Sequence, residues 1–256
     1  HAYYCSDKKS LCQYIIKEYL ENTVVRKVNH NRQEKGMSSF KIRTDLALEA
    51  RENMDNAAEE CRGVSVEEEY DQKSEIRITR VVIETKNGAK AMGKPIGTYI
   101  TLEAPAMALP DEDYHQEIAG ELARQLRRII PGLEGEQSVM VVGLGNRDVT
   151  ADALGPNVVD NLIITRHMVK EYGKAAYNQN RIHMISGLIP GVMAKTGMES
   201  QEIIKGVVEQ TKPDVVVVID ALAARSTKRL NRTIQVTNTG IHPGSGVGNN
   251  RNAITK

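Results

Sequence analysis

The feature that most constrains the fold is an uninterrupted apolar run at residues 215–219, flanked by an aspartate on each side. Valine and isoleucine occupy every position, so no face of this segment is suited to water, and the run predicts a central parallel strand covered on both faces. A second apolar run, residues 138–143, ends in a glycine turn, and helical stretches separate the two runs. This alternation predicts an α/β fold, namely a three-layer α/β/α arrangement around a twisted, mostly parallel (mixed) sheet.

The N-terminal half predicts a β-hairpin insertion. Residues 75–83 alternate apolar and polar side chains, and a second β-like stretch covers residues 96–105. Between them stands Asn87-Gly88, and Asn-Gly is a strong hairpin signal because both turn positions favour a positive φ. Residues 110–132 then carry acids first, an apolar stripe, and arginines last, which indicates a helix whose charges match its dipole.

Composition narrows the possible partners. The chain of 256 residues has a net charge of +1, which offers no global attraction for nucleic acid. No apolar run approaches the roughly 18 residues of a membrane span, so we expect no membrane association. Cys5, Cys12 and Cys61 are too scattered for a disulfide framework. A reducing, cytoplasmic location is therefore predicted.

A glycine turn at residues 141–156, VVGLGNRDVTADALGP, follows the first apolar strand. Gly143-x-Gly145 begins like a dinucleotide-binding turn, but Asp148 stands where the third glycine belongs, and its carboxylate would repel a pyrophosphate. No Gly-Lys-Ser/Thr follows, so a Walker A loop is excluded as well. An ordinary strand–helix turn with an aspartate capping the helix remains an alternative.

Two aspartates stand beyond the ends of the two predicted strands. Asp220 directly follows the most apolar strand, where a charge is costly unless it points into a crevice. Adjacent parallel strands would bring Asp152 and Asp220 to one edge of the sheet, where ligands bind in open α/β folds. Two close carboxylates share one proton, so the pair could act as acid and base on a water, or hold a metal. For Asp220, capping of the following alanine-rich turn remains an alternative.

A glycine-rich loop near the end of the chain is the third candidate. Such a loop lets the backbone approach a peptide or another ligand closely. Within it, His242 could bind a metal or a substrate carbonyl, or be an ordinary loop histidine. The residues that we expect to contact substrate are Gly240, His242, Gly244, Ser245 and Gly246.

A basic cluster follows Asp220 closely in the sequence. Three explanations are open: it pairs with the acidic region at residues 45–75, contacts an acidic substrate, or is solvated. Its members are Arg225, Lys228, Arg229 and Arg232.

From about residue 41 to its end, the chain contains several long motifs that occur in the same order in a known protein family. These are RTDLA at 43–47, VGLGNRDVTADALGP at 142–156, GLIPGVMAKTGMES at 187–200, VIDALAAR at 218–225 and TGIHPGSGVGNNR at 239–251. The sequence resembles the spore germination protease family, endopeptidases that degrade small acid-soluble spore proteins. The family is similar in fold to hydrogenase maturation proteases, and its members are treated as atypical aspartic proteases without a cofactor. The resemblance implies that Asp152 and Asp220 are the catalytic pair.

The resemblance also implies how the protein is made and assembled. Members are zymogens that remove an N-terminal segment, which places cleavage near Phe40-Lys41 and divides the chain into an appendage, 1–40, and a single α/β peptidase domain, 41–256. It further implies a homo-oligomer, a tetramer, in the cytoplasm of the forespore or spore core. The family continues beyond the glycine-rich loop, so the domain is expected to be C-terminally shortened here.

Two other functions remain open from the sequence. The same carboxylates could bind a metal, as in the maturation-type proteases. Alternatively, the chain could be a nonenzymatic module that binds a peptide or another ligand at the glycine-rich edge.

Overall fold

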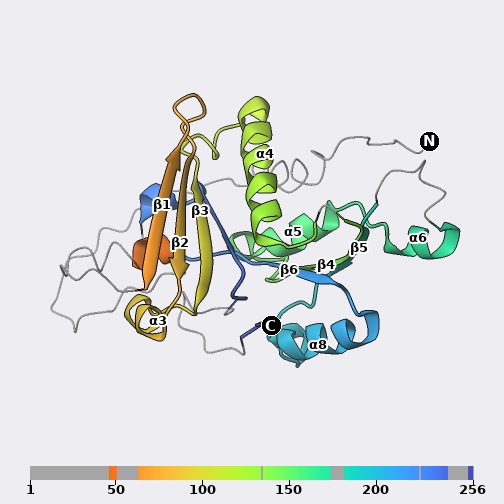
Figure 1. Cartoon of the computed structure of the whole chain (residues 1–256). Coiled ribbons are helices and arrows are strands. Elements are labelled where there is room, and N and C mark those ends of the chain that lie inside the picture. Colours follow the sequence, from red (N-terminus) through yellow and green to blue (C-terminus); the bar gives the residue numbers. More distant parts are fainter. Residues whose placement is uncertain are drawn as a thin grey trace, which may run out of the picture.

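A computed structural model describes residues 46–50, 63–133, 135–173, 182–224, 226–241 and 253–255. Within this part of the chain the strands form two sheets, one antiparallel with the order β1-β2-β3-β7 and one parallel with the order β5-β4-β6 (Figure 1). The predicted α/β class is confirmed. The strands are, however, divided between an antiparallel and a parallel sheet rather than joined in one mixed sheet.

The antiparallel sheet contains β1 (Val64–Tyr70), β2 (Arg77–Ile83), β3 (Gly97–Glu103) and β7 (Thr233–Thr237). Helix α4 (Glu112–Ile129) covers one face, and α3 (Lys86–Met92) with residues 46–50 covers the other. Alternate residues of each strand therefore enter different cores, as the two-residue period of a strand requires. Toward α4 the core contains Ile78, Ile100, Leu102, Ile118 and Leu122, and on the other face it contains Ala47, Val81, Ile83, Met92 and Tyr99.

The connection between β2 and β3 differs from the prediction. The two strands pair antiparallel, as expected, but Asn87 and Gly88 lie in helix α3 and do not form a hairpin turn. The Thr85 hydroxyl accepts a hydrogen bond from the Gly88 amide and caps the helix, and Met92 is buried at its end. A helix cap and one buried apolar anchor thus override a local turn preference.

The parallel sheet contains β5 (Met184–Leu188), β4 (Ser138–Gly143) and β6 (Val215–Ile219). Helix α5 (Leu154–Asp160) packs on one face and α8 (Ser200–Thr211) on the other, so this half is a three-layer α/β/α unit (Figure 1). β4 is the central strand, and all of its residues are buried. The prediction that residues 215–219 form the central strand was wrong, because among the described strands β6 pairs with β4 alone.

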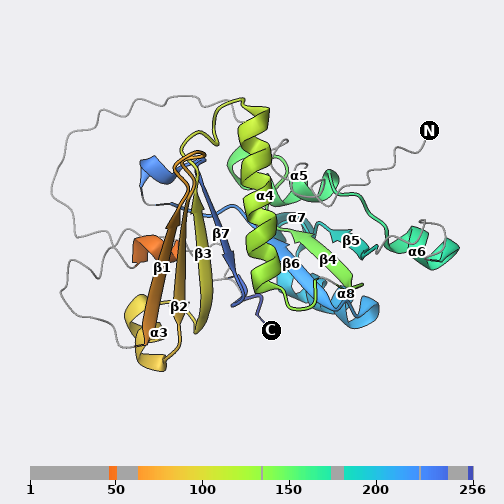
Figure 2. The same ribbon diagram turned by 45° about the horizontal axis from the view of Figure 1, so that its top comes forward.

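The other short elements of the described segments are η1 (Thr150–Asp152), α6 (Arg166–Tyr172), α7 (Met193–Thr196) and η3 (Thr227–Arg229). Figure 2 shows α4 running between the two sheets. In the described segments, no helix combines the length and the apolar composition that a bilayer crossing demands.

Candidate functional site

The carboxyl ends of β4 and β6 bring the two predicted aspartates to the same edge of the parallel sheet. The last register pair is Gly143 with Ile219, and the Leu144 amide donates to the Ile219 carbonyl at 2.8 Å. Asp220 follows Ile219 directly, while Asp152 lies in η1, at the end of the turn that leaves β4. Strands distant in sequence therefore meet at the place where open α/β sheets bind ligands.

Glycines bring the loop that carries Asp152 into backbone contact with both strand ends. A Cβ on Gly155 would lie 2.3 Å from the Leu144 carbonyl oxygen and 2.7 Å from that of Ile219. Gly145 has a φ of +117°, and a Cβ there would meet the Asp152 carbonyl oxygen at 1.9 Å. The glycines of this motif thus serve close chain packing, in agreement with the absence of a phosphate-binding sequence.

The Asp152 carboxylate closes the glycine turn. It is half-buried, and its Oδ2 accepts a hydrogen bond from the Asn146 amide at 2.8 Å. Helix α5 begins after Ala153 without a side-chain cap, so the alternative in which an aspartate caps this helix is wrong. The carboxyl group is instead held against the turn, beside the ends of β4 and β6.

Asp220 is also half-buried, and its Oδ1 accepts a hydrogen bond from the Ala221 amide at 2.9 Å. The next residues, 221–224, adopt no regular secondary structure. The hydrogen bond from the Ala221 amide agrees with the alternative in which Asp220 caps the alanine-rich turn. Both aspartates of the predicted pair therefore have carboxylates oriented by backbone amides at the strand ends.

Asp148 has a different environment. Its exposed carboxylate forms an ion pair with Lys195, and the hydrogen bond from that ammonium lowers the pKa of Asp148 below its ordinary value. Beside it, Arg147 binds Asp160 through two hydrogen bonds, with Nη2 3.0 Å from Oδ1. The two pairs tie the turn to α7 and to the end of α5.

A cavity of about 200 Å³ adjoins this edge. Residues 145–148 line one side, and Ile189, Gly191, Val192 and Lys195 line the other. Gly145 and Asn146 line the cavity and also contact Asp152, whereas Asp152 and Asp220 are not among its lining residues.

The base of the glycine-rich loop lies beside the same strand. Ile241 and Ile254 exchange two backbone hydrogen bonds, of 2.9 and 2.8 Å, and both pack against the core that contains Leu144. Gly240 has a φ of +87°, and a Cβ there would lie 2.2 Å from the Ile254 carbonyl oxygen. The other predicted substrate and processing residues lie outside the described part of the chain: His242, Gly244, Ser245, Gly246, Phe40 and Lys41.

One member of the basic cluster has a buried partner. Arg229 donates from Nε to Glu103 at 2.8 Å and from Nη1 to Glu49 at 3.4 Å. Glu49 is fully buried and also accepts from the Ser226 amide at 2.9 Å. Of the three explanations for the cluster, pairing with the acidic region 45–75 thus holds for Arg229. The sequence did not single out Glu49, because helical periodicity shows no difference between a buried and an exposed glutamate there.

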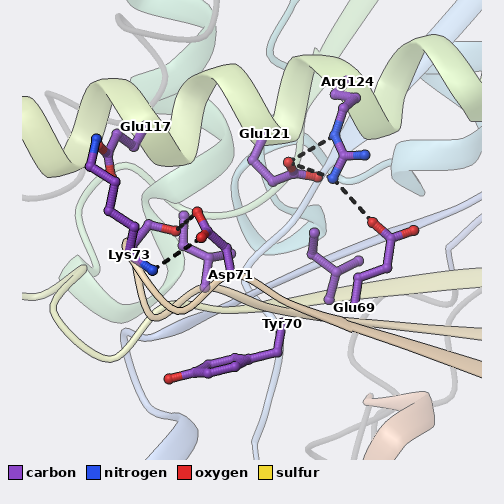
Figure 3. Close-up of a pocket in the computed structure, with 10 residues that line it drawn as sticks. Glu69, Tyr70, Asp71, Lys73, Glu117, Glu121 and Arg124 are labelled. Carbon is purple, nitrogen blue, oxygen red and sulfur yellow. Dashed lines mark hydrogen bonds and ion pairs between the residues drawn. The ribbon is translucent and has the colours of Figure 1, made fainter.

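A second and larger cavity, of about 490 Å³, lies between the β1–β2 end and α4 (Figure 3). Its carboxylates are compensated: Glu69 and Glu121 bind Arg124, at 3.2 and 2.8 Å, and Glu117 lies 3.8 Å from Lys73. The hydrogen bond from Arg128 is the main cause that lowers the pKa of Glu69. None of its lining residues belongs to the strand ends that carry the aspartates, so we assign it no catalytic role.

Within the described segments, no group of three or more His, Cys, Asp or Glu side chains is arranged to hold a metal ion. His242 lies outside those segments.

Comparisons with known proteins agree with the motif-based resemblance. The family described as germination protease matches residues 42–256. A germination protease of Caldanaerobacter subterraneus subsp. tengcongensis is 51% identical over 214 residues, which cover 84% of this chain and 64% of the relative. Those of Bacillus subtilis and Priestia megaterium are 44% and 43% identical, over 86% of this chain and 60% of each relative. The chain thus spans about three fifths of the length of these relatives.

Proposed function

This chain belongs to the germination protease family, and we propose that it is an aspartic-type endopeptidase that hydrolyses small acid-soluble spore proteins during germination. The observation that carries the proposal is the meeting of the Asp152 and Asp220 segments at one edge of the parallel sheet. The Leu144–Ile219 hydrogen bond and the close packing of Gly155 against both strand ends support it.

The proposed chemistry needs one proton shared by the two carboxyl groups. The ionised member takes a proton from a water while the water oxygen bonds to the peptide carbonyl carbon. The protonated member gives its proton to the developing oxyanion, which stabilises the tetrahedral intermediate. When the C–N bond breaks, the leaving amine takes up the proton that the first carboxylate accepted, and one hydroxyl of the gem-diol intermediate returns its proton to the second carboxylate as the C=O bond re-forms. Products are one carboxylic acid and one amine, and the pair returns to its starting protonation.

The substrate groove is proposed to run along the glycine-rich loop. Its base at Gly240 and Ile241 is anchored to the core near the end of β4, which supports a location beside the aspartates. His242, Gly244, Ser245 and Gly246 would line the groove and contact the substrate backbone.

The remaining features inferred from the resemblance are part of the same proposal. The peptidase domain would cover residues 41–256, and residues 1–40 would be a pro-segment removed near Phe40-Lys41. We propose a homotetramer in the cytoplasm of the forespore.

The experiment is cleavage of a small acid-soluble spore protein by the purified chain. General acid and base groups each contribute about 10²- to 10⁴-fold, so Asp152→Asn and Asp220→Asn should each lose at least about a thousandfold in kcat/KM while keeping a native circular dichroism spectrum. Glu117→Gln, which removes a carboxylate from the other cavity, should retain wild-type turnover.

Near-normal turnover by either aspartate variant would remove that residue from the mechanism. Loss of activity on exhaustive chelation, with recovery on adding a divalent metal, would favour the maturation-type metal mechanism instead. Substrate binding without any cleavage would favour the nonenzymatic binding module.

A further inference from the structure

The residues that line the cavity of about 200 Å³ beside the glycine turn favour one kind of bound group. Its aliphatic wall consists of Ile189 and Val192, both half-buried, with Gly145 and Gly191 adding backbone surface. We propose that this cavity is a specificity pocket for one apolar side chain of the substrate, next to the bond that is cleaved. The inference rests on the proposed endopeptidase function and assigns Val192 and Ile189 as specificity-determining residues.

The charged residues around the cavity compensate one another. Asp148 is paired with Lys195 across the rim, and Arg147 is paired with Asp160. A charged substrate side chain would have to compete with a partner already in place, whereas an apolar one gains by leaving water. The chemistry of the wall therefore favours an aliphatic or aromatic side chain.

The size of the cavity limits it to a single side chain. An apolar cavity of about 150 Å³ accommodates benzene, so about 200 Å³ suits a leucine, isoleucine or phenylalanine side chain. Two neighbouring residues of a peptide would not fit together. The pocket should thus determine which side chain is accepted at one position of the substrate.

Its location links the pocket to the proposed chemistry. Two residues that line the cavity also contact Asp152: the Asn146 amide donates to Asp152 Oδ2 at 2.8 Å, and Gly145 packs against the Asp152 backbone. Asp152 itself does not line the cavity, but a side chain held there lies next to the two turn residues that contact Asp152. This would position an adjacent peptide bond for attack, a gain in proximity and orientation.

The test uses capped peptides from a spore protein substrate in which each residue flanking the cleaved bond is replaced in turn by Ala, Leu or Phe. Removing methylenes from a well-filled pocket lowers kcat/KM at least about tenfold, so the wild type should prefer Leu over Ala by that factor at one position. Val192→Phe, which fills the pocket, should reduce this ratio to within about threefold. Val216→Phe is the matched control, because Val216 lies partly exposed on β6 and outside the pocket.

A second variant keeps the test valid if Val192→Phe fails to fold. Ile189→Ala enlarges the pocket and should shift preference from Leu toward Phe, whereas Ile163→Ala, at an exposed residue, should leave it unchanged. Active variants with an unaltered Leu/Ala/Phe profile would overturn the assignment while leaving the proposed function intact.

Measurements of peptide binding distinguish a failure of the pocket assignment from a failure of the proposed endopeptidase function. The same peptides are titrated into Asp152→Asn, with and without Val192→Phe, by calorimetry. One outcome would support the pocket and contradict the proposed function. In it, the wild type cleaves none of the peptides, the Leu peptide binds at least about tenfold tighter than the Ala peptide, and Val192→Phe removes this difference in affinity. Equal affinity for all peptides, with or without cleavage, overturns the pocket.

Discussion

The carboxylates beside the two sheets of this molecule have different partners. On the antiparallel side, carboxylates are neutralised by arginines, as in the pairs of Glu69 with Arg124 and Glu103 with Arg229. At the edge of the parallel sheet, Asp152 and Asp220 accept hydrogen bonds from backbone amides. Both kinds of hydrogen bond favour the ionised carboxylate, but a guanidinium adds a full positive charge and therefore holds a carboxylate in that form more strongly than a backbone amide does. The difference shows why the larger cavity is the poorer candidate for the active site.

The largest expected difference between the two regions is in how a glycine-to-alanine substitution changes the free energy of unfolding. Gly155→Ala should lower the free energy of unfolding by about 3 kcal/mol or more, because its Cβ would meet backbone atoms that cannot move aside. Gly120→Ala, in the exposed part of α4 with no atom near its Cβ, should instead stabilise by about 0.5–1 kcal/mol. Urea unfolding of both variants measures the difference. If the two substitutions had similar effects, the close approach of α5 to the strand ends would be wrong.

The buried pair at Glu49 tests whether the antiparallel side is structural. Removing one partner of a buried ion pair costs about 3–5 kcal/mol, so Glu49→Gln should destabilise the fold by about 3 kcal/mol. Glu67→Gln is the matched control, since Glu67 is exposed and its ion pair with Arg80 measures 3.8 Å, and it should cost less than about 0.5 kcal/mol. Unfolding by denaturant checks both values. Equal stability of the two variants would show that Glu49 does not anchor residues 46–50.

Much of the site region was predictable from the sequence because strand-level signals are strong there. The apolar runs located β4 and β6, and the parallel pairing then required Asp152 and Asp220 to approach the same edge. The helix at residues 112–129 was equally clear, because its charges match its dipole and its stripe faces one core. Each of these inferences depends on local periodicity, which a single sequence contains.

Other features depend on partners that a single sequence does not reveal. Asn87-Gly88 forms part of a helix because the Thr85 cap and the burial of Met92 outweigh its turn preference. The central position of β4 depends on which strands pair, and the more apolar run belongs to its neighbour. The Glu49–Arg229 pair joins positions 180 residues apart. The resemblance supplied the proposed roles of the aspartates, which periodicity alone left open.

The smallest expected effect concerns acid stability on the antiparallel side. The Arg128 hydrogen bond, followed by that of Arg124, lowers the pKa of Glu69 from its ordinary 4.5. A lowered folded-state pKa stabilises the protein above the unfolded value, and this contribution is lost as pH falls through the folded value. At pH 7, Glu69→Gln should therefore cost less than about 1 kcal/mol, because the side chain is half exposed and solvent screens the pair.

The pH dependence distinguishes this ion pair from a packing effect. Well below the folded-state pKa of Glu69, wild type and Glu69→Gln should become equally stable, since the carboxyl group is then neutral in both states of the wild type. High salt at pH 7 should reduce the difference as well. Glu68→Gln serves as the control, because Glu68 precedes Glu69 on β1 and has no ion-pair partner among the described residues. A difference that persists in acid would mean that Glu69 acts through packing, and the contrast between charge-paired scaffold and amide-held site would lose this example.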